Sequence, residues 1–119
     1  VELYIKLKLI IKYIAVSAGI GIILFMLGFI LAAGGHGTEV PSIFFFPWAF
    51  ILYYLSYFFW DHTSILVTIM LLQYPLYGFL IGKSNNSRRR SIIIIIICLL
   101  HIGAFICAYL MRQKVLEIY

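Results

Sequence analysis

Charged residues are scarce in this chain of 119 residues. They make up 11% of the sequence, and only four of them are acidic. Soluble domains carry about 25% charged residues. Hydrophobic residues make up 65% of the chain, which is more than a water-soluble core of this size can enclose. We therefore expect a membrane protein in which lipid surrounds the excess apolar side chains.

Residues that could take part in catalysis, form a disulfide or bind a metal are also few. The two cysteines, Cys98 and Cys107, lie nine residues apart in one apolar run, which on a helix places them on opposite faces about 13 Å apart along the axis. A disulfide needs Cα atoms within about 7 Å, so these two cannot bridge within one chain. No nucleophile–base pair, pair of carboxylates or metal-ligand cluster has a convincing spacing. The sequence thus predicts a protein that is not an enzyme and has no cofactor and no metal.

Positive charge exceeds negative charge, with a net charge of +5. The cations lie beside apolar runs, which is typical of residues that face lipid headgroups. We expect contacts with anionic headgroups, and no nucleic-acid partner, for a cluster in the longest polar segment: Lys83, Arg88, Arg89 and Arg90.

Four apolar runs each have about the length needed to cross a hydrocarbon core of ~30 Å at ~1.5 Å per residue. We predict an all-α integral membrane protein, a single domain over residues 1–119 that forms a compact bundle of four transmembrane helices. The expected location is the cell membrane, as a multi-pass protein of a bacterial inner membrane. The predicted spans are Tyr13–Ala33, Ile43–Trp60, Ile65–Gly82 and Ile92–Met111.

The second run has an alternative. Ile43–Trp60 is short, rich in aromatic residues and carries Pro47, so it could be a re-entrant segment beside three spans. Four spans would place five cations on the side of the termini and four on the other, which hardly decides orientation. A re-entrant segment would place seven cations in the cytoplasm and two outside. We favour four spans with cytoplasmic termini.

Small residues form a stripe on the first run. Ser17, Gly21, Gly28 and Ala32 fall within roughly 60° of one another on a helix. Such a stripe lets another helix approach closely, because lipid offers no hydrophobic drive for association. It predicts a helix-packing face, used either for self-association or within the chain.

Two polar residues lie in the middle of the last two runs. Gln73 is nine residues before Gly82, and His101 is nine residues after Ile92. In an antiparallel pair of helices both would lie at one depth, roughly 14 Å from the helix ends. We predict that they form an intramembrane polar pair.

Other polar residues extend this hypothesis. Tyr74 and Tyr77 would join the pair, and His36 and Glu39 in the first loop would form the mouth of a site. One interpretation is an interhelical clamp worth about 0.6–2 kcal/mol. The other is a proton or solute site.

Two functions follow from these features. The first is a non-catalytic membrane protein that acts by helix–helix assembly, as a homo-oligomer or as an accessory subunit of a membrane complex. The second is a small transporter or channel for a solute, an ion or protons, which could work as an antiparallel dimer.

Overall fold

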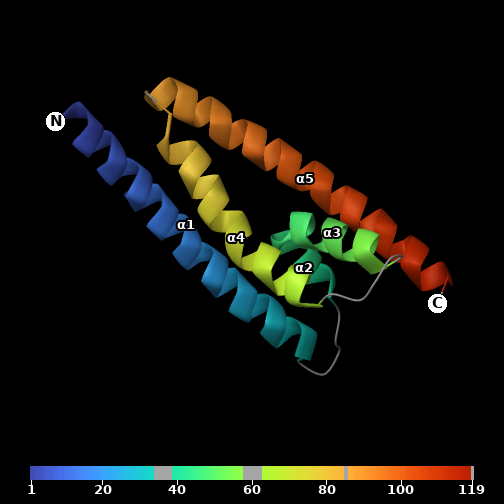
Figure 1. Cartoon of the computed structure of the whole chain (residues 1–119). Coiled ribbons are helices and arrows are strands. Elements are labelled where there is room, and N and C mark those ends of the chain that lie inside the picture. Colours follow the sequence, from blue (N-terminus) through green and yellow to red (C-terminus); the bar gives the residue numbers. More distant parts are fainter. Residues whose placement is uncertain (34–38, 58–62, 85, 119) are drawn as a thin grey trace.

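A computed structural model describes residues 1–33, 39–57, 63–84 and 86–118 of the chain. Every element in these ranges is a helix and none is a strand, which confirms the all-α prediction for them. The helices are α1 (Glu2–Ala33), α2 (Val40–Phe45), α3 (Pro47–Tyr57), α4 (Thr63–Gly82) and α5 (Ser87–Ile118) (Figure 1).

Two of the described helices have the length and composition of membrane spans. They are α1 and α5, with 32 residues each. The described apolar part of α4, Leu66–Gly82, is shorter. Most large apolar side chains along α1 and α5 are exposed, so their surfaces suit lipid or apolar partners better than water.

Glycines let α1 and α4 pack closely in opposite directions. A Cβ on Gly21 would lie 2.8 Å from Cβ of Tyr74, and one on Gly82 would lie 2.9 Å from Cα of Ile10. Such distances are too short for any side chain, so glycine is required at both contacts.

The segment expected as one span over 43–60 is not one helix. Helix α2 ends at Phe45 and α3 begins at Pro47, with Phe46 between them at φ −132° and ψ 56°. Pro47 has no N–H to bond the carbonyl four residues earlier, and it disfavours helical angles at the preceding residue. The structure corrects the prediction of a continuous helix here.

The chain reverses direction at this break. The Tyr54 hydroxyl lies 3.0 Å from Oε1 of Glu39, fifteen residues earlier. In a continuous helix the two residues would be about 22 Å apart along the axis. Helices α2 and α3 therefore form a hairpin, with its tip at 44–47 and its base at Glu39 and Tyr54.

The long helices surround this α2–α3 hairpin. Helices α4 and α5 diverge from the turn that joins them, and α3 packs between them at the wider end (Figure 1). The most buried apolar side chains belong mainly to the hairpin: Ile43, Phe46, Ala49, Phe50 and Tyr54. The chain termini lie at opposite ends of a molecule 56 Å long (Figure 1).

Helix α5 begins earlier than the predicted span. The side chain of Asn86 accepts a hydrogen bond of 2.8 Å from the backbone N–H of Arg89 and so caps the first turn. The basic residues Arg88–Arg90 therefore lie on the helix, and the polar connection between α4 and α5 shortens to residues 83–86.

Candidate functional site at the hairpin tip

The tip of the hairpin contains backbone carbonyls that need partners. The last carbonyls of any helix lack intrahelical donors. At the end of α2 the break at Phe46 and Pro47 prevents α3 from continuing the hydrogen-bond ladder. In an apolar interior an unbonded carbonyl costs free energy, so other donors must reach Phe44 and Phe45.

Three side chains from α4 and α5 supply these donors. Nε2 of His101 lies 2.6 Å from the carbonyl oxygen of Phe44. The Tyr74 hydroxyl donates to the carbonyl of Phe45 at 2.7 Å, and Nε2 of Gln73 donates to the same oxygen at 3.3 Å. Helices α4 and α5 are thus joined through the backbone of the hairpin tip.

Tyr77 connects the side chains to one another. Its hydroxyl lies 3.2 Å from Nε2 of Gln73 and 3.0 Å from Nδ1 of His101. Because the Phe44 carbonyl can only accept, the proton of a neutral His101 ring must be on Nε2. Nδ1 then accepts from the Tyr77 hydroxyl, and that hydroxyl accepts from Gln73.

The structure therefore brings together Gln73, Tyr74, Tyr77 and His101, the four residues that the sequence singled out at this depth. Gln73 and His101 are linked by hydrogen bonds through the Tyr77 hydroxyl and not by a bond of their own. Sequence reasoning missed the backbone acceptors. The available signal was Pro47, since a proline inside an apolar run leaves carbonyls without donors.

Aromatic rings surround the tip. Phe44 packs edge-on against Phe105, with ring centroids 5.3 Å apart, and Phe46 packs in the same way against Tyr74 at 5.4 Å. Such edge-to-face pairs add stability beyond their buried area. The bonds to the Phe45 carbonyl are therefore partly buried beside apolar rings, whereas the bond between His101 and Phe44 is exposed.

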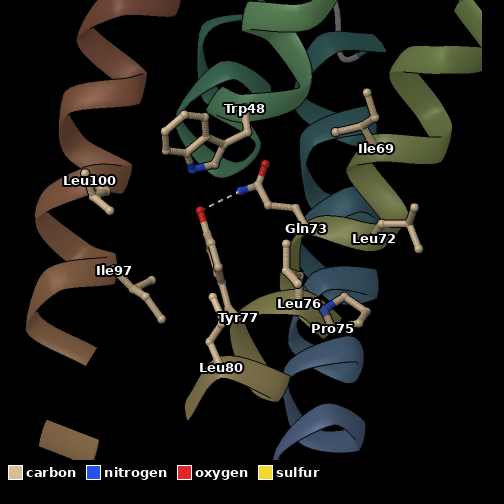
Figure 2. Close-up of a pocket in the computed structure, with 10 residues that line it drawn as sticks. All are labelled: Trp48, Ile69, Leu72, Gln73, Pro75, Leu76, Tyr77, Leu80, Ile97 and Leu100. Atoms are coloured by element: carbon tan, nitrogen blue, oxygen red, sulfur yellow. Dashed lines mark hydrogen bonds between the residues drawn. The ribbon is translucent and has the colours of Figure 1, made fainter. Parts of the chain in front are cut away.

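One polar atom of this cluster has no partner. Gln73 is 5% exposed, and its Oε1 is buried without a hydrogen bond to any described residue. Gln73 also lines a groove of about 640 Å³ between α4 and α5, which Trp48 borders on the α3 side (Figure 2).

A second polar contact closes the base of the hairpin. Nε of Arg112 lies 2.9 Å from Oε1 of Glu39, the same oxygen that accepts from Tyr54. Glu39, expected at the mouth of a site, is therefore held by α5 and α3. His36, the other residue expected there, lies outside the described residues.

The small-residue stripe of α1 packs mostly within the chain. A Cβ on Gly28 would meet Oγ of Ser42 at 2.6 Å, and one on Gly21 would meet Tyr74. Ser17 lies against Gly78, since its Oγ would be 2.7 Å from a Cβ there. Ala32 is half-buried near the end of α1.

The basic cluster lies at the end of the molecule where α4 meets α5. Arg90 stacks over the ring of Tyr13 at 5.1 Å from its centroid, and Lys83 lies 5.8 Å from the centroid of Phe79. Arg88 and Arg89 are exposed. Lys83 and Arg90 therefore lie over apolar rings, as residues at a headgroup boundary would.

The tip cluster suits hydrogen bonding better than metal ligation. Among the described residues no three His, Cys, Asp or Glu side chains come together in a way that could hold a metal ion. No protein-family model, no curated protein and no solved structure matches this chain.

Proposed function

We propose that the chain crosses a membrane three times, through α1, α4 and α5, and that the α2–α3 hairpin is re-entrant. The proposal is supported by the chain reversal between Glu39 and Tyr54 and by the position of the termini at opposite ends (Figure 1). Irregular backbone at membrane depth is tolerated where protein encloses it. The donors from His101, Gln73 and Tyr74 meet that requirement at the tip.

The distribution of Lys and Arg residues predicts how this arrangement is oriented in the membrane. Seven of the nine Lys and Arg residues lie toward the end where Arg90 stacks on Tyr13 and Gly82 meets Ile10. The other two lie at the opposite end, where Arg112 contacts Glu39 and Lys114 is 3.9 Å from Glu117. By the positive-inside rule the N-terminus is cytoplasmic. The seven cations are Lys6, Lys8, Lys12, Lys83, Arg88, Arg89 and Arg90.

The function that we infer is assembly in the bilayer, without chemistry of its own. The protein would act as a homo-oligomer, and its membrane would be a bacterial inner membrane. The single observation that carries this proposal is the outer face of α5. Gly103 is exposed, with nothing within 4 Å of the place where its Cβ would lie, and the exposed Cys107 follows four residues later.

Such a face permits close approach of a second helix. Residues four apart lie on one side of a helix, and small residues there let two backbones approach each other in lipid. Gly21, Gly28 and Gly78 are already in contact with other parts of the chain. Gly103 is therefore available to a partner in a way that these glycines are not.

The polar cluster has a supporting role in this proposal. Its donors are directed to the chain's own backbone at Phe44 and Phe45, so it fixes the hairpin between α4 and α5. A fixed hairpin holds α5 at a constant angle and presents Gly103 in one geometry.

Oxidative cross-linking tests the assembly, and the chain supplies its own control. Cys98 and Cys107 are both exposed on α5 but about 180° apart around the helix. We expect Cys98→Ser, which retains Cys107, to form a disulfide-linked dimer in native membranes. The variant Cys107→Ser should not, and Gly103→Leu should abolish the dimer. Equal cross-linking through either cysteine would contradict an interface at Gly103, and a cross-link to another protein would indicate an accessory subunit.

A second function, transport of a solute or protons, is favoured by Oε1 of Gln73, which has no hydrogen bond to a described residue and belongs to a side chain that lines the groove. Flux into liposomes, measured for the wild type and His101→Ala, distinguishes it from assembly. Flux that His101→Ala abolishes would favour transport, and no flux from either protein would favour assembly.

A further inference from the structure

A groove runs along the outer side of the hairpin tip, between α4 and α5. Its volume of about 640 Å³ lies within the ~300–1,000 Å³ of small-molecule sites. Apolar side chains from both helices line most of it, among them Leu76, Leu80, Ile97 and Leu100. Its polar groups are at one end, where Trp48, Gln73 and Tyr77 meet (Figure 2).

The hydrogen-bonding capacity of that end is almost fully used. The Tyr77 hydroxyl contacts Gln73 and His101, and the indole nitrogen of Trp48 faces it as well (Figure 2). The orientation of the Gln73 amide is fixed, because Nε2 donates to the carbonyl of Phe45, which cannot donate in return. Oε1 of Gln73 is therefore the acceptor at this end of the groove that has no hydrogen bond to a described residue, and it is buried.

We propose that the groove binds an uncharged, membrane-soluble amphiphile. Its apolar chain lies between α4 and α5, and its O–H or N–H group donates a hydrogen bond to Oε1 of Gln73. Trp48, which is 38% exposed at the border of the groove, moves aside to admit the polar group. The inference rests on the membrane placement proposed above, but not on the interface at Gly103.

The lining excludes other occupants. None of the described residues that line the groove is charged, so an ionised headgroup would be buried among them without a counter-ion. The helix of a second copy would bring no free backbone donor, because its N–H groups are already bonded within the helix. A neutral long-chain alcohol, phenol or amide has both the apolar chain and the free donor that the groove requires.

Quenching of tryptophan fluorescence tests this proposal in the full chain. The chain has two tryptophans, so the Trp60→Phe variant reports on Trp48 alone. A long-chain alcohol with a bromine near its hydroxyl should quench Trp48 saturably. The matched methyl ether, which has no donor, should require about tenfold more ligand, as expected for the loss of one hydrogen bond worth about 1.4 kcal/mol.

Two adjacent leucines on α5 supply a matched pair of variants. Leu100 lines the groove, whereas Leu99 is exposed on α5 and is not part of the lining. Leu100→Phe should weaken saturable quenching by the alcohol at least several-fold, and Leu99→Phe should leave it unchanged. Gln73→Met should make the alcohol and the ether equivalent, with the circular dichroism spectrum of each variant confirming that it is folded.

Equal half-saturation by the alcohol and the ether in the wild type would overturn the proposal. So would an unchanged affinity in Leu100→Phe, or a Gln73→Met variant that still prefers the alcohol. A different result would show that the protein does not span the membrane as proposed. In that case the protein would be released from membranes without detergent.

Discussion

Tyr54 and Arg112 share one oxygen of Glu39. The Tyr54 hydroxyl lies 3.0 Å from Oε1 and Nε of Arg112 lies 2.9 Å from it. This carboxylate joins the start of α2, the later part of α3 and the C-terminal part of α5. The hairpin is thus held at its base by a charged contact, and at its tip by His101, Gln73 and Tyr74.

The ion pair at the base should contribute measurably to stability. Arg112 has a side chain only 21% exposed, although Glu39 is 43% exposed. We expect Arg112→Gln to lower the free energy of unfolding by about 1–2 kcal/mol, because a hydrogen bond to a charged group is lost in a partly solvated place. Thermal unfolding in detergent would measure it.

Lys114 provides the control for this ion pair. It lies 3.9 Å from Glu117, and both side chains are more than 70% exposed. Lys114→Gln should therefore change the stability by less than about 0.5 kcal/mol. If Lys114→Gln lowered the stability as much as Arg112→Gln does, the loss of a positive charge, and not the ion pair with Glu39, would be responsible.

Removal of the imidazole at the tip should destabilise the hairpin. His101→Ala leaves the Phe44 carbonyl without its donor at 2.6 Å. This bond is exposed on the surface of the chain, and in the proposed membrane setting lipid offers no replacement donor, so the loss should cost about 1–3 kcal/mol. Protease susceptibility of the α2–α3 segment should rise in parallel with the loss of thermal stability. The exposed neighbour Ile102 is the reference, and Ile102→Ala should behave as the wild type does.

The contact between α1 and α4 should not tolerate a methyl group. A Cβ on Gly78 would collide with the backbone carbonyl of Tyr13, so Gly78→Ala should cost about 1–3 kcal/mol through overpacking. Gly19, on the same helix as Tyr13, has open space around its missing Cβ. If Gly19→Ala destabilised the protein as much as Gly78→Ala does, close packing of α1 on α4 would not be the cause.

The number of membrane crossings can be read from the accessibility of the two ends. Glu2→Cys and Glu117→Cys, each in a Cys98→Ser, Cys107→Ser background, would react with an impermeant maleimide. Three crossings predict labelling from opposite sides of the membrane, with Glu2→Cys reactive only from the cytoplasm. Labelling of both positions from one side would instead favour four spans.

The proximity of Gln73 and His101 could be predicted because it follows from counting residues along two antiparallel helices. Gln73 and His101 each lie nine residues from the end of a predicted run, and in the structure Tyr77 contacts both, although α5 begins at Ser87, five residues before the predicted run. Their actual acceptors could not be predicted in this way. The carbonyls of Phe44 and Phe45 are backbone atoms, available only because the chain breaks at Phe46 and Pro47.

The sequence by itself determined the helical class and the apolar character of the surface, because both follow from local composition and from the need of every backbone group for a hydrogen bond. Only the tertiary structure decided how the segment after α1 folds. Pro47 permits a kinked helix as well as a reversal, and the reversal becomes stable when Glu39 and Tyr54 meet and when donors from two distant helices reach the tip. Those contacts join residues far apart in the chain, so no local pattern specifies them.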